Sequence, residues 1–126
     1  MIKQLFFALR HGHSEAMLLK KIASSPDVCV SRYGLTEHGR EQCISAADEF
    51  RDLLDSRVKT GQTFSLRIVS SDFKRALETA EFFSIRLLDD IQSCRLRDCF
   101  LKDAWAGIEF DNRLRERNFG DFEGQV

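Results

Sequence analysis

The sequence predicts a layered α/β domain with a mostly parallel sheet, and three observations support this. Apolar runs of strand length alternate with amphipathic stretches in the order strand, helix, helix, strand, helix. The first run, Leu5–Leu9, is continuously apolar, which is typical of a strand buried on both faces of a parallel sheet. The 126 residues, 43% hydrophobic and 31% charged, suit one packed core with a solvated surface. We therefore expect residues 1–126 to form a single domain.

The first half of the chain is expected to contain two helices after that strand. The first helix runs from about Glu15 to Ile22, and the segment Ser24–Asp27, which contains a proline, ends it. The second helix is long and follows Thr36 as its N-cap. Its apolar residues recur at three- and four-residue spacing as far as Leu54, which predicts one buried face.

The second half of the chain repeats this arrangement. The loop Lys59–Thr63 leads into a strand at Leu66–Ser70, and Ser71 or Asp72 is expected to cap the helix that follows. Ile108–Leu114 alternates weakly between apolar and polar residues and predicts a further short strand.

Composition and charge exclude several classes of function. The 19 lysines and arginines balance 20 aspartates and glutamates, for a net charge of -1, which argues against nucleic-acid binding. No apolar run is long enough to span a membrane, and Arg10–His13 interrupts the first run too early for a signal peptide. We expect a cytoplasmic protein with reduced cysteines, a disulfide between Cys94 and Cys99 being the alternative.

Chemically versatile residues follow both expected strands. Arg10, His11 and Gly12 come directly after the first strand, at the carboxyl end where α/β sheets bind ligands. The backbone N–H groups of the next helix start, together with the Ser14 hydroxyl, suit an anion. Arg75 lies about one turn into the helix after the second strand, and it would join Arg10 on the same anion if the strands are neighbours. The alternative is that His11 is structural and Arg75 is a solvated side chain.

Four motifs resemble the signatures of the histidine phosphatase superfamily, in its phosphoglycerate-mutase-like branch. In chain order they are Arg10–Ala16, which is similar to that family's RHG motif, Leu35–Gln42, Ser70–Asp72 with Arg75–Ala76 and Thr79–Ala80, and Leu114–Gly120 with Glu123–Gly124. Their order and their spread over nearly the whole chain argue against a chance match. The resemblance implies a three-layer α/β/α fold.

The resemblance also assigns roles to individual residues. It implies that His11 is the nucleophile and forms a phosphohistidine, which water then cleaves. Arg10, Ser14 and Arg75 would hold the phosphoryl oxygens, and Glu116 would protonate the leaving oxygen and later help to activate water. No metal and no cofactor are expected, because His11 and the other histidines lack a supporting arrangement of cysteines or carboxylates. The expected partner is a phosphorylated small molecule, such as a sugar phosphate.

Two departures from the family pattern affect the expected activity. Met17 stands where the family usually carries an asparagine that binds phosphate. The family's second active-site histidine has no counterpart, since the histidines of this chain are His11, His13 and His38. We therefore interpret the chain as an incomplete family member in which an edge of the sheet is left open.

The preferred function is hydrolysis of phosphate monoesters, impaired in the chain as given. Gly120–Gly124 resembles the phosphatase members of the family, and Leu114–Arg117 resembles the fructose-2,6-bisphosphatase-like members. The alternatives are phosphoryl transfer of the phosphoglycerate-mutase type and a non-catalytic domain that binds phosphorylated ligands. The sequence sets neither the exact substrate nor the oligomeric state.

Overall fold

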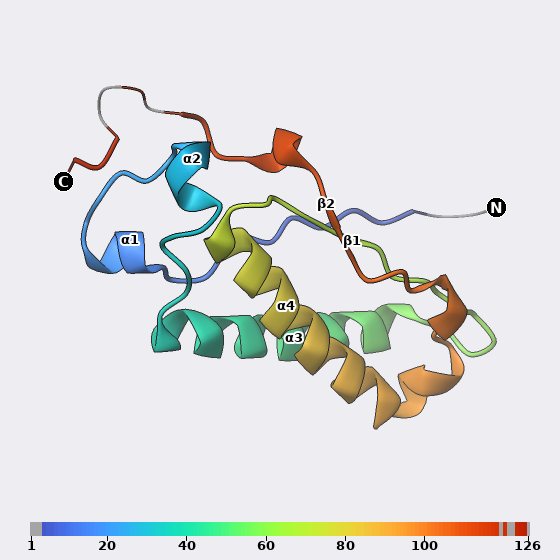
Figure 1. Ribbon diagram of the computed structural model, residues 1–126. Helices are drawn as coiled ribbons and strands as arrows, with labels where there is room; N and C mark the ends of the chain where they lie inside the picture. The colour runs from blue at the N-terminus through green and yellow to red at the C-terminus, as the bar shows by residue number, and fades with distance from the viewer. Residues whose placement is uncertain (1–3, 119, 121–122, 126) are drawn as a thin grey trace.

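The computed structural model describes residues 4–118, 120 and 123–125. In chain order the elements are α1 (Glu15–Leu18), α2 (Pro26–Cys29), α3 (Glu37–Arg57), β1 (Ile68–Ser70), α4 (Lys74–Gln92), the 3₁₀ helices η1 (Arg95–Asp98) and η2 (Lys102–Ala104), β2 (Ile108–Phe110) and the 3₁₀ helix η3 (Asn112–Leu114). The chain has the predicted α/β fold (Figure 1). None of its described helices is long and apolar enough to cross a membrane.

The sheet consists of β1 and β2, which pair in parallel as predicted. Ile68 lies opposite Ile108 and Ser70 lies opposite Phe110, with α4 making the crossover between the strands. The pairing extends by one residue, because the N–H of Asp111 donates to the carbonyl of Ser70 over 2.9 Å. The carboxyl ends of both strands therefore lie together, and the chain segments that follow them start from the same edge.

Both strands are shorter than the sequence predicted. β1 covers the last three residues of the expected Leu66–Ser70, and β2 covers the first three of the expected Ile108–Leu114. The rest of the second segment turns into η3, because the Asp111 side chain accepts the N–H of Arg113 and caps that turn.

Two helices, α3 and α4, form the main core with the residues that follow them. They pack against each other and lie on one side of the strands (Figure 1). The buried side chains of this core are Ala47, Leu54, Phe83, Leu87, Ile91, Leu96 and Phe100. Thr36 is the N-cap of α3 as predicted, since its Oγ1 accepts the N–H of Gly39 over 3.2 Å.

A second, smaller core holds α1 and α2 to the beginning of α4. It consists of Ala16, Ala23, Cys29 and Phe73, of which Cys29 is fully buried and Phe73 is 2% exposed. Phe73 is therefore a fixed wall beside the first turn of α4, where the candidate site lies.

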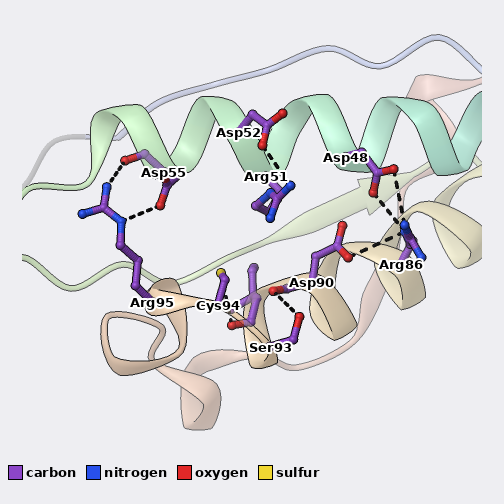
Figure 2. Close-up of polar contacts among 10 residues, drawn as sticks. Asp48, Arg51, Asp52, Asp55, Arg86, Asp90, Ser93, Cys94 and Arg95 are labelled. Carbon is purple, nitrogen blue, oxygen red and sulfur yellow. Dashed lines mark hydrogen bonds and ion pairs between the residues drawn. The ribbon is translucent and has the colours of Figure 1, made fainter.

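Charged side chains connect α3 with α4 and η1 along their solvent-facing edge. Figure 2 shows Arg86 between two carboxylates, with its Nε 2.9 Å from Asp48 and 3.6 Å from Asp90. Further along, Arg95 of η1 binds the Asp55 carboxylate over 2.7 Å (Figure 2). Within the described residues, Oδ2 of Asp90 is buried without a hydrogen-bond partner.

The expectation of a buried strand at Leu5–Leu9 is wrong. Within the described part of the chain, no backbone group of this run is hydrogen-bonded, and the run has no strand assignment. Phe6 is 88% exposed, whereas the Phe7 ring contacts the edge of Phe50 at a centroid distance of 4.9 Å. An apolar run becomes a buried strand only when neighbouring strands pair with it, and no described segment pairs with this one.

The first helix is also shorter than the expected Glu15–Ile22. α1 ends at Leu18, and Lys20 adopts a left-handed backbone with φ of 55°. The N–H of Lys21 then donates to the carbonyl of Ala16 over 2.9 Å, the long-range bond of a Schellman ending. Glycine is the usual residue at the left-handed position, so the lysine concealed this helix end in the sequence.

Two helix starts differ from the predictions. Ser24–Asp27 was expected only to end a helix, but Pro26 also opens α2, where its fixed φ suits a first helical position. The N-cap of α4 is Phe73 and not Ser71 or Asp72. Ser71 contributes by accepting the N–H of Phe73 over 3.2 Å, which orders the turn before the helix.

Candidate active site

A pocket of about 270 Å³ opens where the end of β1, the start of α4 and the segment after η3 meet the residues that precede α1. Its lining consists of Arg10, His11, Ser71, Phe73, Arg75, Ala76, Leu114 and Glu116. Four of the five predicted site residues are therefore neighbours in the structure, although they come from three separate parts of the sequence.

Arg75 is the buried cation of this pocket. It lies in the first turn of α4 and is 4% exposed. Its Nη2 donates to Oε2 of Glu116 over 2.6 Å and to the Ala23 carbonyl over 2.8 Å, and its guanidinium lies over the Phe73 ring at 5.1 Å. A buried charge needs such partners, and they hold this guanidinium in one position.

Glu116 is the more exposed partner in that ion pair. Its side chain is 48% exposed, against 5% for Arg75, and it lies in a segment that is neither helix nor strand. A rearrangement that separates the pair therefore moves the Glu116 carboxylate and leaves the arginine in place.

Within the described part of the chain, one ring nitrogen of His11 has a hydrogen-bond partner and the other has none. Its Nδ1 lies 2.8 Å from the carbonyl oxygen of Gly12, and since a carbonyl only accepts, Nδ1 carries the hydrogen. The pKa of His11 is lowered by burial and by the charges of Arg75 and Arg10, which together outweigh the opposing effects of the Gly12 bond and Glu116. The imidazole is therefore neutral at pH 7, with a lone pair on Nε2.

Gly12 is a glycine because helix α3 lies directly against it. A Cβ at this position would lie 2.7 Å from the carbonyl oxygen of Gly39, which is closer than real Cβ atoms approach. The N–H of Gly12 donates to Oγ1 of Thr79 over 3.0 Å. Sequence reasoning placed Thr79 in a motif without a role, because its partner lies 67 residues away along the chain.

Arg10 supplies a second positive charge at the pocket. It is exposed and forms no ion pair within the part of the chain that the structure describes. The nearby Arg115 is different, because two hydrogen bonds join it to Asp72, one of them 2.7 Å long. With Arg75 paired to Glu116 and His11 neutral, Arg10 leaves the pocket with a net positive charge that favours an anion.

Ser14 does not reach the pocket, contrary to the prediction. It is fully buried, and its Oγ accepts the N–H of Met17 over 3.3 Å as the N-cap of α1. Its Oγ therefore serves the start of its own helix, and Ser14 is not among the residues that line the pocket. Met17 itself is 43% exposed on α1.

A support behind Arg75 was not anticipated from the sequence. Oε2 of Glu123 accepts from the N–H of Ser24 over 2.7 Å and from its hydroxyl over 2.6 Å. Burial alone would raise the pKa of Glu123, but the hydrogen bonds from Ser24 and Ser25 lower it. These bonds hold the segment whose Ala23 carbonyl binds Arg75.

The remaining histidines lie outside the pocket. The rings of His13 and His38 contact each other at a centroid distance of 5.6 Å, and Nδ1 of His13 lies 2.7 Å from Oγ1 of Thr36. Across the described residues, no group of three or more histidines, cysteines, aspartates or glutamates could hold a metal ion. All four cysteines are free thiols, so the alternative disulfide between Cys94 and Cys99 is absent.

Comparison with known proteins identifies relatives of this chain. The model of the histidine phosphatase superfamily (branch 1) matches residues 6–126. A search of curated proteins gave no significant match. Part of the fourth motif, Phe119, Asp121 and Phe122, lies outside the described residues, and so does part of the observation that favoured the phosphatase members.

Solved structures of phosphatases share the fold. A structure titled mycobacterial hydrolase 1 superposes with a TM-score of 0.58 at 26% identity, over 92% of this chain and 40% of that one. A mycobacterial glucosyl-3-phosphoglycerate phosphatase in complex with VO3 gives 0.57 at 27% identity, over 92% and 42%. A phosphoserine phosphatase from Entamoeba histolytica gives 0.51 at 22% identity and shows the fold alone. The chain thus spans about two-fifths of the length of these proteins.

Proposed function

Because the chain belongs to the histidine phosphatase superfamily, we propose that its pocket transfers the phosphoryl group of a phosphate monoester to Nε2 of His11, from which water releases phosphate. The observation that carries this proposal is the state of His11. Its imidazole is neutral, with Nδ1 bonded to Gly12 and a free lone pair on Nε2, beside two arginines and a carboxylate. These are the requirements of a nucleophilic histidine.

In the first step, the Nε2 lone pair attacks phosphorus and a P–N bond forms as the P–O bond to the leaving group breaks. Arg75 and Arg10 stabilise the negative charge on the phosphoryl oxygens. Glu116, a carboxylate while it pairs with Arg75, takes the acidic proton of the phosphate monoester monoanion and gives it to the leaving oxygen, which departs as a neutral alcohol.

In the second step, water replaces the alcohol and attacks phosphorus. The Glu116 carboxylate takes a proton from this water as the new P–O bond forms and the P–N bond breaks. Glu116 then passes this proton to the departing phosphate, so the products are inorganic phosphate and His11 with its Nε2 lone pair restored, and the Glu116 carboxylate can pair with Arg75 again, without a metal or cofactor.

Substrate entry requires that Arg75 exchange one anion for another. Nη2 of Arg75 donates to Oε2 of Glu116 over 2.6 Å, and a phosphoryl oxygen would take that place. The buried arginine stays where it is, while the half-exposed carboxylate moves toward the leaving group. The ion pair thereby keeps the acid next to the site of bond cleavage before substrate binds.

The proposed substrate is a small phosphorylated metabolite. Two features support this: the pocket volume of about 270 Å³ suits a phosphoryl group with a small substituent, and a similar protein is a phosphatase acting on glucosyl-3-phosphoglycerate. The VO3 in that phosphatase structure is an oxyanion of the kind that Arg10 and Arg75 would bind here.

A second candidate is a domain that binds phosphorylated ligands without turnover. The positions of the histidines favour this candidate, because His11 is the histidine that lines the pocket, whereas His13 and His38 lie elsewhere. On this alternative, the arginines bind an oxyanion but His11 is not phosphorylated.

The test is to incubate the purified chain with p-nitrophenyl phosphate and follow both nitrophenol release and acid-labile phosphate on the protein. We expect phosphohistidine in the parent chain, loss of it in His11→Ala, and retention in His13→Ala as the matched control. Adding EDTA should change nothing. Equal nitrophenol release by the parent and His11→Ala chains would overturn the proposal, and vanadate binding without phosphorylation would establish the second candidate.

A further inference from the structure

We infer that Thr79 is a positioning residue that sets the tautomer of His11 and the location of Arg75 through one hydroxyl group. Thr79 lies in the second turn of α4, is 5% exposed, and is not among the residues that line the pocket. The catalytic part of this inference rests on the proposed function, whereas the part that concerns the tautomer does not.

The Thr79 hydroxyl joins two backbone groups, and it is also a hydrogen-bond partner of the Cys43 thiol. The N–H of Gly12 is a donor, so Oγ1 accepts from it, over 3.0 Å. The hydroxyl hydrogen is then free to donate to the carbonyl of Arg75, over 2.7 Å. One side chain therefore connects the backbone of Arg75 to the backbone beside His11.

Gly12 is held on three sides as a result. Its N–H is bound by Thr79, its Cα lies against the carbonyl of Gly39, and its own carbonyl accepts from Nδ1 of His11 over 2.8 Å. The Thr79 bond holds the peptide between His11 and Gly12, and the next peptide, which carries the Gly12 carbonyl, is held by the N–H of His13, which donates to Oε1 of Gln42 over 2.8 Å. The Gly12 carbonyl, which places the hydrogen of His11 on Nδ1, therefore depends on Thr79 through the first peptide and on Gln42 through the second.

The Thr79 hydroxyl connects the two chain segments that form the site. His11 belongs to the segment before α1, and Arg75 belongs to α4, so neither element alone fixes their separation. Misplacement of a reacting group by about 1 Å can lower a rate about a hundredfold. Without the Thr79 hydroxyl, the N–H of Gly12 loses its partner and only the Gln42 bond still holds this segment, so we expect the distance and the tautomer to become more variable.

The experiment compares Thr79→Val, which keeps the shape and removes the hydroxyl, with Thr79→Ser, which keeps the hydroxyl. Ser84→Ala is the matched control, because Ser84 is 5% exposed on the same helix and, among the described residues, its hydroxyl donates only to the carbonyl of Glu81. The tautomer of each of the three histidines is read from two-bond ¹H–¹⁵N correlation spectra.

We expect His11 to carry its hydrogen on Nδ1 in the parent, Thr79→Ser and Ser84→Ala chains, and to become a mixture of tautomers in Thr79→Val. Phosphorylation of His11 in a single turnover should fall about 10- to 100-fold in Thr79→Val only. An unchanged His11 tautomer in folded Thr79→Val would overturn the inference. If the parent chain is not phosphorylated, the proposed function fails, but the tautomer spectra still decide the role of Thr79.

A measurement on the parent chain covers the case in which Thr79→Val does not fold. Hydrogen exchange at the Gly12 amide should be strongly protected, since this N–H is bound to a buried hydroxyl. Exchange of the Gly12 amide as fast as that of the exposed Gly61 would show that the Thr79 bond is not maintained, and would overturn the inference.

Discussion

His11 owes its charge state to the residues around it. Burial disfavours its protonated form, the Arg75 and Arg10 charges act in the same direction, and the pKa falls below the usual 6.5. As the pH drops through 6.5, histidines of the unfolded chain take up protons before the folded His11 does. This residue therefore costs the folded state stability in acid, and it keeps its nucleophilic form to a lower pH than a free histidine would.

Replacing Arg10 with glutamine tests the electrostatic part of this account. We expect Arg10→Gln to raise the pKa of His11, because one of the charges that disfavour its protonation is removed. NMR titration of the imidazole measures the shift. Arg40→Gln is the control, since Arg40 is exposed and pairs with Glu37. An unchanged or lower pKa of His11 in Arg10→Gln would contradict the account.

Single site residues were predictable where the sequence places them after a strand. An expected strand before each of them made His11 and Arg75 candidates, and the resemblance of their motifs gave them roles; the pocket includes both, although the run before His11 is not a strand. Ser14 was predicted from its type and spacing, but a serine at a helix start has its own backbone to cap, and sequence alone does not tell the two uses apart. Thr79 and Glu123 could not be assigned, because their partners lie 67 and 99 residues away.

At the scale of the elements, the C-terminal end of helix α1 could not be predicted from the sequence. Lys20 occupies the left-handed position of its Schellman ending, with φ of 55°. This conformation costs an L-residue with a side chain roughly 1 kcal/mol relative to glycine. Helix α3, in contrast, was predicted well, because it begins at a threonine cap and its apolar residues recur at regular spacing.

The substitution Lys20→Gly should therefore stabilise the chain by about 1 kcal/mol. Lys21→Gly is the matched control, because Lys21 lies next to it and is absent from the positive-φ residues of the described chain. Denaturant unfolding of both variants measures the difference. Equal or lower stability of Lys20→Gly relative to the parent chain would argue against strain at this position.

At the interface of α3 and α4, Asp90 is a carboxylate in an unfavourable place. Burial and the adjacent Asp48 raise its pKa, although Arg86 opposes this effect, and its Oδ2 is buried without a hydrogen-bond partner in the described chain (Figure 2). An acid with a raised folded-state pKa lowers stability above its ordinary pKa, and this penalty disappears in acid. The Asp48 carboxyl has its pKa lowered, first by its hydrogen bond to Arg86.

We expect Asp90→Asn to stabilise the chain at pH 7 by about 1 kcal/mol, because asparagine removes the buried charge and offers an N–H to Asp48. The advantage should shrink as the pH falls toward the ordinary aspartate pKa of 3.8, because the folded wild-type carboxyl, whose pKa is raised, becomes protonated above that value. Thermal unfolding across this pH range measures it, with the exposed neighbour Asp89→Asn as the control. A constant difference at all pH values would show that the charge is not the cause.

Across the whole molecule, the apolar run Leu5–Leu9 shows the limit of reading a fold from one strand at a time. Its composition indicates burial, but burial of a strand depends on neighbours, and the local pattern does not reveal whether they are present. Phe6 is left 88% exposed as a result. Exposed apolar side chains of this kind promote association between chains.

Replacing Phe6 with lysine should reduce concentration-dependent association of the 126-residue chain and leave its melting temperature unchanged. The matched variant is Phe7→Lys, which should lower the melting temperature because the Phe7 ring packs against Phe50 at 4.9 Å. Light scattering and thermal unfolding separate the two effects. Association that persists in Phe6→Lys would show that this run is not the contact surface.

The parallel register of β1 and β2 also has a kinetic consequence. Ile68 can meet Ile108 only after the intervening chain, which includes the whole of α4, has turned back on itself. The contacts between α3 and α4 involve a simpler closure, because the two helices follow each other with only β1 between them. The helical pair should therefore form early on the folding route and strand pairing late. A substitution that weakens the pairing, such as Val69→Gly, should accelerate unfolding and leave the folding rate nearly unchanged.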